Sequence, residues 1–189
     1  MSPKKTSRAV PETYVALLRG INVGGKNKVP MADLTALFEE AGCAEVRTYI
    51  QSGNVLFRAP AKIASRLPGT ISERIARRLD LRVPVVLRTA EELEEAARRN
   101  PFLAAGADPD TLHLMFLADL PRPAAVAGLD GRRSPPDAFA VVGREIYLRL
   151  PNGAARTKLT NAYFDAKLAT TSTMRNWRTV LKLVDLARG

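Results

Sequence analysis

The stretch EVRTYIQSGNVLFR, residues 45–58, decides the fold of this chain. Its first part alternates, with Val46, Thr48 and Ile50 on one side and charged or aromatic residues on the other. Such alternation is typical of a half-buried strand. Ser52 and Gly53 then provide a tight turn, and a second apolar run follows. The stretch therefore predicts a β-hairpin.

Further strands and helices flank this hairpin on both sides. Residues 13–19 predict a buried strand, and residues 31–41 place apolar side chains on one helical face before Gly42. After the hairpin, residues 70–79 predict a helix and residues 83–88 predict a strand. The order β-α-β-β-α-β, within about 75 residues, is the ferredoxin-like pattern. Residues 13–88 therefore predict a ferredoxin-like domain.

The rest of the chain predicts a connector and a second, smaller α+β half. Residues 89–110 form the connector and open with a capping box, TAEE. Residues 111–189 predict a strand, a weak helix, a hairpin, and helices over 158–168 and 175–187. This second half has the order β-α-β-β-α-α, with a helix where a last strand would stand. The fold class is α+β, and the two halves are interpreted as related.

Composition predicts a soluble cytoplasmic protein. The chain has 189 residues, of which 46% are hydrophobic and 25% charged, as in folded globular proteins. No apolar run approaches the ~18 residues that cross a bilayer, so no membrane contact is expected. Residues 1–12 lack the apolar core of a signal peptide and are expected to be a disordered tail. Cys43 is the single cysteine, which excludes an internal disulfide and a cysteine-based metal site. We expect no metal and no cofactor.

The charge of the chain indicates an anionic partner. The formal net charge is +10 at pH 7, and such a surface attracts polyanions, of which nucleic acid is the commonest in a cell. An arginine-rich composition that only serves solubility is the alternative, because charge alone names no site.

A glycine-rich loop follows the first strand, and from Gly20 it reads GINVGGKN. The spacing G-x-x-x-x-G-K is that of a phosphate-binding loop, but Asn27 stands where a Ser or Thr hydroxyl should hold magnesium. Pro30 also delays the helix that should begin at the lysine. We therefore expect no nucleotide hydrolase, whereas a more general anion site remains.

In the predicted sheet, the loop after the first strand and the turn of the hairpin lie at the same edge. This edge predicts a ligand site made of loop and turn residues: Arg19, Asn22, Gly24, Gly25, Lys26, Gln51, Ser52 and Asn54. Gly24 and Gly25 would let a ligand approach the backbone closely. A structural clasp is the alternative, in which the Asn and Gln side chains only satisfy backbone groups of the loop.

A second candidate site lies near the C-terminus. Thr173 is the expected N-cap of the last helix, so that Arg175 would lie in the first turn, where the helix dipole disfavours cations. This conflict indicates an anion at that point, either a protein carboxylate or a bound phosphate. Asn176 adjoins Arg175, and Lys158 and Asn161 share a helical turn nearby. These four residues complete the predicted ligand-binding set.

Binding is favoured over catalysis. The sequence contains no nucleophile elbow, paired-acid motif or Rossmann fingerprint, and His113 has no ligand partner at metal-binding spacing. The predicted partner is an anionic ligand, a nucleotide or a nucleic acid. One variant is single-stranded RNA on the sheet face, contacting Tyr14, Arg47, Tyr49 and Arg58. The alternative is an enzyme that acts on a small anionic substrate, with Lys26 or Lys158 as electrostatic groups.

Several short motifs, in order, resemble a known bacterial family. They are RGINVGG (19–25), QSGNV (51–55), NPF (100–102), HLMFL (113–117), PNG (151–153), KLTN (158–161) and RNW (175–177). The family is called "domain of unknown function 1697", and the likeness runs from about Tyr14 to Leu186. The resemblance implies a bacterial protein with a two-part α+β fold. It implies no particular activity, cofactor or catalytic residue.

Overall fold

The computed structural model describes residues 10–189. Most of the expected N-terminal tail, residues 1–9, lies outside the described residues. The first strand, β1, begins at Glu12, which is the last residue of the expected tail. Within residues 10–189, no helix is both long enough and apolar enough to span a membrane.

The first half forms a four-stranded antiparallel sheet in the order β2-β3-β1-β4. Its elements are β1 (Glu12–Leu18), α1 (Met31–Glu40), β2 (Ala44–Tyr49), β3 (Asn54–Ala59), α2 (Ala61–Ala64), α3 (Leu67–Leu79) and β4 (Val85–Thr89). This arrangement confirms the predicted ferredoxin-like order. The helix expected from residue 70 begins three residues earlier, and Thr70 lies inside it with its hydroxyl bonded to the Arg66 carbonyl.

Both faces of the first sheet are covered. Alternate residues of β1 and β3 pack against α1 and α3, and Tyr14 stacks on Phe57 with ring centroids 5.7 Å apart. The opposite residues, including Val15 and Leu17, pack against the helices of the other half. Arg47 donates to the Leu186 carbonyl of the last helix. The variant in which RNA binds on this sheet face is therefore wrong, because the face is already occupied.

A connector leads into a second antiparallel sheet in the order β6-β7-β5-β8. The connector consists of α4 (Ala90–Arg98), α5 (Pro101–Ala104) and the 3-10 turn η1 (Pro109–Thr111), and the capping box before α4 is confirmed. The elements of the second half are β5 (Leu112–Leu117), α6 (Pro123–Ala127), β6 (Ala138–Val142), β7 (Glu145–Arg149), α7 (Asn161–Leu168), β8 (Ser172–Asn176) and α8 (Trp177–Ala187).

The predicted end of the second half needs a correction. Residues 172–176 are a strand that pairs with β5, and the last helix starts at Trp177 instead of residue 175. Its N-cap is Asn176, whose side chain accepts from the Thr179 amide, and not Thr173. Pairing with the free edge of β5 overrides the local helical pattern. The order is therefore β-α-β-β-α-β-α, and the second half has as many strands as the first.

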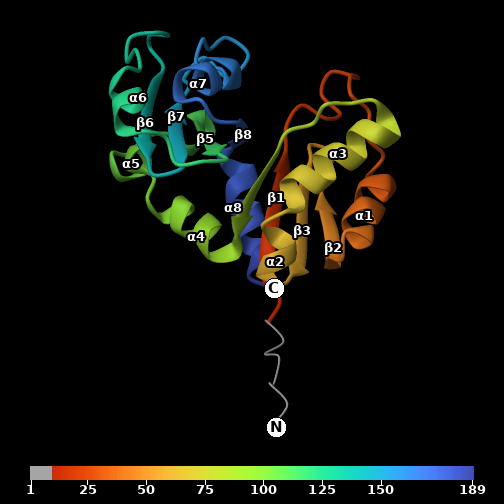
Figure 1. The fold of residues 1–189 in the computed structure, drawn as a ribbon. Helices are drawn as coiled ribbons and strands as arrows, with labels where there is room; N and C mark the ends of the chain where they lie inside the picture. Colours follow the sequence, from red (N-terminus) through yellow and green to blue (C-terminus); the bar gives the residue numbers. More distant parts are fainter. Residues whose placement is uncertain (1–9) are drawn as a thin grey trace.

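The two halves share one hydrophobic core. Figure 1 shows α8 between the two sheets, with α4 beside it, while α1 and α3 lie outside the first sheet and α6 and α7 outside the second. The shared core joins Leu17 of β1 to Leu114 of β5, Trp177 of α8 and Leu93 of α4. The helices that follow β4 and β8 thus hold the sheets together.

Equivalent backbone contacts show that the halves repeat the same unit. The Leu18 backbone amide donates to the Gly53 carbonyl at 2.8 Å, and the Leu117 backbone amide donates to the Arg144 carbonyl at 2.9 Å. Each of these hydrogen bonds joins the end of the first strand of a half to a hairpin turn. One residue later, Arg19 donates to the carbonyl before β4, and Ala118 donates to the carbonyl before β8. The two sheets therefore match in topology and in register.

Candidate functional site

A network of polar side chains joins the end of β1 to α7 and β8. Arg19 Nη1 donates to Asp165 Oδ2 at 2.5 Å and to the Ser172 carbonyl at 3.0 Å. The Ser172 hydroxyl donates to Asp165 Oδ1 at 2.6 Å and accepts from the Asn161 amide at 2.8 Å. Arg19 and Asn161, two of the predicted ligand-binding residues, are therefore engaged by the protein itself, and Arg19 joins the two halves.

Arg175 is the most buried cation of the predicted site, and it lies in β8 rather than in a helical turn. Its Nε donates to Asn54 Oδ1 at 2.6 Å, and its Nη2 donates to the carbonyls of Leu18, Ser52 and Gly53. Nη1 donates to Thr173 Oγ1 and to the Met174 carbonyl. Burial lowers the pKa of Arg175 to about 10, so the guanidinium stays charged at neutral pH. The expectation of an anion beside Arg175 is wrong, because oxygens of the chain itself surround the guanidinium.

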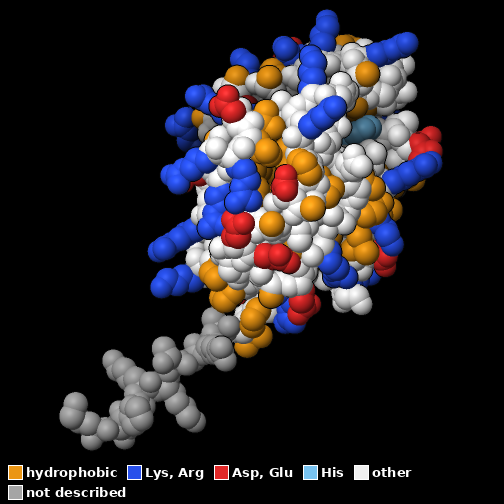
Figure 2. Space-filling view, turned by 90° about the vertical axis from the view of Figure 1, so that its right-hand side faces the viewer, with side chains coloured by type: hydrophobic (Ala, Val, Ile, Leu, Met, Phe, Trp, Pro, Cys, Tyr) orange, Lys and Arg blue, Asp and Glu red, His pale blue; other side chains and the backbone are white. Residues whose placement is uncertain are grey.

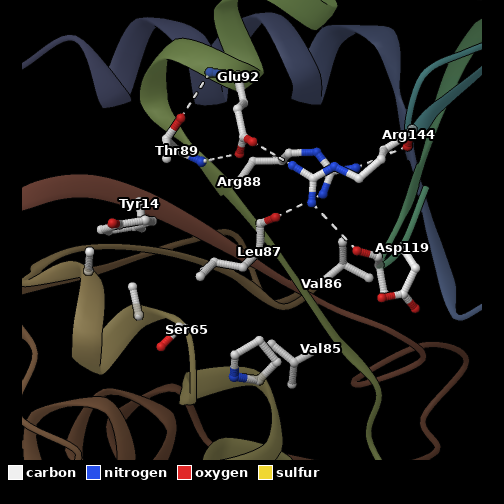
Figure 3. Close-up of a pocket in the computed structure, with 14 residues that line it drawn as sticks. Tyr14, Ser65, Val85, Val86, Leu87, Arg88, Thr89, Glu92, Asp119 and Arg144 are labelled. Atoms are coloured by element: carbon white, nitrogen blue, oxygen red, sulfur yellow. Dashed lines mark hydrogen bonds and ion pairs between the residues drawn. The ribbon is translucent and has the colours of Figure 1, made fainter.

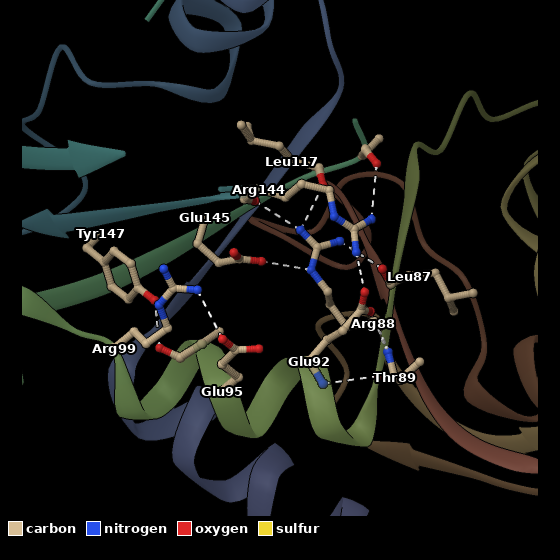
Figure 4. A network of polar contacts seen from close by, with 12 residues as sticks. Leu87, Arg88, Thr89, Glu92, Glu95, Arg99, Leu117, Arg144, Glu145 and Tyr147 are labelled. Carbon is tan, nitrogen blue, oxygen red and sulfur yellow. Dashed lines mark hydrogen bonds and ion pairs between the residues drawn. The ribbon is translucent and has the colours of Figure 1, made fainter. Parts of the chain in front are cut away.

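Arg88 of β4 occupies the equivalent position in the first half. Its side chain contacts residues of the second half (Figures 3 and 4). Its Nη2 donates to the carbonyls of Leu117 at 2.8 Å and Arg144 at 3.0 Å, and its Nε donates to Glu145 at 2.9 Å. Its side chain is fully buried, and burial lowers its pKa despite the nearby carboxylate. Each half thus provides one arginine that binds the end of the first strand and the hairpin turn of the other half.

A cavity of about 460 Å³ lies between the halves next to Arg88 (Figure 3). Tyr14, Ser65 and Glu92 line it from one side, and Asp119 and Arg144 from the other. Its charged groups are already engaged, because Arg144 pairs with Glu92 and the Asp119 carboxylate accepts from Thr170. This cavity therefore offers few free groups to an anion.

The glycine-rich loop forms a short projecting hairpin, residues 22–27, which we call the finger. The backbone N–H of Asn22 donates to the backbone carbonyl of Asn27, and the backbone N–H of Lys26 donates to the carbonyl of Val23. Gly24 and Gly25 at its tip have φ of 57° and 74°, as the two central residues of a type I′ turn require. These glycines thus serve the turn, and the loop is not a cradle with amides converging on a phosphate.

Asparagine side chains fix the base of the finger. Asn22 donates to the carbonyls of Gln51 at 2.9 Å and Val29 at 3.0 Å, and its Oδ1 accepts from the Val29 amide. Asn54 donates to the Tyr49 carbonyl and to the Ser52 hydroxyl. The loop and the hairpin turn therefore meet, as the strand order predicted, and Asn22 joins them while Asn54 fixes the turn itself.

A hollow of about 450 Å³ opens at the base of the finger, and we call it the finger hollow. Its lining consists of Asn22, Gly25, Lys28, Val29, Pro30, Met31 and Gln51. Lys26 is exposed on the finger itself, and Lys28 is exposed at the rim. Neither lysine takes part in an ion pair within residues 10–189. Two exposed lysines outside these ion pairs therefore lie at or next to the lining of the finger hollow.

The remaining predicted residues do not form one site. Lys158 is exposed on a loop where its carbonyl accepts from Arg133 and its amide donates to Ser134. Asn176 caps α8 at the end of β8 that lies away from Ser172. His113 is partly buried, which lowers its pKa. The described residues contain no group of three or more His, Cys, Asp or Glu that could hold a metal ion.

Sequence reasoning missed Arg88, Asp165 and the exposed Ile50. A signal for Arg88 is present, because both β4 and β8 carry an arginine immediately before a helix-capping residue, in Arg88-Thr89 and Arg175-Asn176. Aligning the two halves on that pattern would have placed Arg175 in a strand. Asp165 carries no comparable local signal.

Comparison with known proteins agrees with this geometry. The family model described as "Protein of unknown function (DUF1697)" matches residues 12–147. No curated protein matches the chain. A solved structure, that of the conserved bacterial protein SP0830 from Streptococcus pneumoniae, is similar with a TM-score of 0.69 and 23% identity. The match covers 94% of this chain and 99% of that one, and at this identity the likeness concerns the fold. The chain belongs to the family of proteins of unknown function DUF1697.

Proposed function

We propose that the protein is a binding module for phosphate-bearing ligands, and that a nucleic-acid strand binds at the finger. The observation that carries this proposal is the position of Lys26 and Lys28. Both are exposed beside a hollow and outside the ion pairs of the described residues, whereas the buried cations Arg88 and Arg175 are saturated by the protein.

The shape of the site favours an extended ligand. The finger projects from the sheet edge, so its lysines can follow a backbone of successive phosphates. The finger hollow, at about 450 Å³, falls within the range of about 300 to 1,000 Å³ that is usual for ligand sites. It could therefore receive one nucleotide unit of a longer strand.

The lining of the finger hollow favours binding over catalysis. It combines amides, a lysine and apolar side chains, and includes no carboxylate, imidazole or thiol. These are the groups that most often move protons or attack substrates in enzymes. An enzyme acting on a small anionic substrate at this edge therefore has less support.

Electrostatics supports a polyanion over a single phosphate. The net charge of +10 raises the local concentration of any polyanion. Figure 2 shows Lys and Arg side chains along the upper and left rims of the face that carries the helices of the first sheet. Such a distribution suits contacts with several phosphates.

The proposal can be tested by salt-dependent binding of a fluorescent single-stranded oligonucleotide. The double variant Lys26→Ala, Lys28→Ala should weaken binding roughly tenfold at low salt and reduce the salt slope by about 1.4, which corresponds to two lost phosphate contacts at about 0.7 each. The measurement is fluorescence anisotropy across a salt series.

A matched control removes two other exposed lysines, Lys62→Ala and Lys167→Ala, on α2 and α7. Both double variants have the same net charge, so any difference between them comes from position. Equal loss of affinity in the two variants, or no binding by the native protein, would overturn the proposal.

A further inference from the structure

Ile50 has an unusual conformation for its position in the chain. Its φ is 49°, in the left-handed region, and 51% of its surface is exposed. A β-branched residue is a genuine outlier in this region, where glycine or asparagine fits without strain. Because the side chain is half exposed, burial does not fully offset the strain.

A second exposed apolar side chain lies close by. Val23 on the finger is 63% exposed. The hydrogen bond from Asn22 to the Gln51 carbonyl, at 2.9 Å, joins the neighbours of these two residues. Val23 and Ile50 therefore flank one contact between the finger and the β2-β3 turn, and we call them the apolar pair. Strained residues that persist are concentrated at binding sites, which supports a ligand beside Ile50.

The finger hollow lies beside the apolar pair, because Asn22 and Gln51, the chain neighbours of Val23 and Ile50, line it. Val29 is buried at its floor, and Pro30 and Met31 form part of its wall. Asn22 and Gln51 supply amide groups on the same lining, and Lys28 supplies charge at the rim. The site is therefore apolar in one part, amide-bearing in another, and cationic outside.

We infer that this site takes an unpaired base, so that the nucleic acid bound at the finger is single-stranded. A base has apolar faces and a polar edge, and in a single strand it can leave its neighbours and enter a hollow. In a duplex the faces are stacked and the edges paired, which leaves the apolar pair without a partner. The phosphates on either side of the base would contact Lys26 and Lys28. This inference rests on the function proposed above and names the form of the ligand.

The test compares three labelled probes of equal length: a base-bearing single strand, an abasic single strand with the same phosphates, and a duplex. The native protein should bind the base-bearing strand about tenfold more tightly than the abasic strand, because base contacts add to the phosphate contacts. It should also prefer the base-bearing strand to the duplex. Equal affinity for base-bearing and abasic strands, or a preference for duplex, would overturn the inference. Failure to bind any probe would instead contradict the proposed function.

Variants of the apolar pair separate base contacts from fold effects. Val23→Ser and Ile50→Asn should each reduce the preference for the base-bearing strand severalfold and leave the affinity for the abasic strand unchanged. Ile50→Asn should also raise the thermal midpoint by about 2 °C, because asparagine tolerates the left-handed region. The control Leu120→Ser, at a residue that is 71% exposed, should change neither quantity. If Ile50→Asn instead lowered stability and the affinity for all probes together, Ile50 would be a fold residue and the inference would be wrong.

Discussion

Two residues of the turn between β2 and β3 have positive φ for different reasons. Ile50 is half exposed, so packing of its side chain does not account for its positive φ. Gly53, with φ of 78°, lies against β1, and a Cβ placed there would be 2.8 Å from Leu18 Cβ and 3.0 Å from the Leu18 carbonyl oxygen. The first position leaves room for a ligand, and the second is fixed by packing.

Gly53→Ala should therefore destabilise the protein much more than Gly24→Ala. Both glycines have positive φ, and the strain of alanine there costs about 1 to 2 kcal/mol. At Gly24 nothing lies within 4 Å of the added carbon, so this strain is the whole cost. At Gly53 the clash with β1 must add about 1 to 3 kcal/mol, because the nearest atoms belong to the backbone and to a buried residue. Chemical denaturation of the two variants measures the difference, and equal losses would contradict the packing argument.

At the scale of elements, the sequence predicted the strands, turns and helix caps that depend on local periodicity and capping residues. The hairpin of β2 and β3 and the capping box before α4 depend only on residues close together in the sequence, and both are confirmed. Strand β8 was missed because Asn176 is at once its last residue and the cap of α8, with no turn between them. The contact between the finger and the β2-β3 turn was also predicted, from the order of the strands. The contacts of the reciprocal arginines could not be predicted, because they join segments between 29 and 157 residues apart in the sequence.

Arg175→Met should cost about 3 to 5 kcal/mol of unfolding free energy. Removing this guanidinium leaves the Leu18 carbonyl and the Asn54 Oδ1 without the buried donor that Arg175 supplies, and such groups are costly when unpaired. Arg175→Lys should not restore stability, because a single ammonium cannot reproduce the planar fork of donors. Arg178→Met serves as the control, since Arg178 is exposed and its ion pair with Asp110 contributes less than about 1 kcal/mol. A loss at Arg175 no larger than that at Arg178 would show that the contacts of Arg175 with the first half do not stabilise the fold.

The whole molecule is built as one cooperative unit from two repeated halves. Each half gives the other an arginine, Arg88 or Arg175, and a helix, α4 or α8, for the shared core. In each sheet, the face that points toward the other sheet is covered by the helices between them. The finger stands outside this arrangement at the edge of the first sheet, so its conformation and charge can vary without disturbing the core.

Damage confined to the first half should therefore unfold both halves together. Phe57 packs in the outer core of the first sheet against Tyr14 and Phe38, away from the second sheet, and Phe57→Ala should cost about 3 to 5 kcal/mol. Trp177, the single tryptophan, is buried in the shared core at the start of α8 and reports on the second half. Because the core is shared, the variant should lower the denaturation midpoint of Trp177 fluorescence and that of far-ultraviolet circular dichroism by the same amount. If the halves were independent, circular dichroism would show an early partial transition while the fluorescence midpoint stayed at its native value.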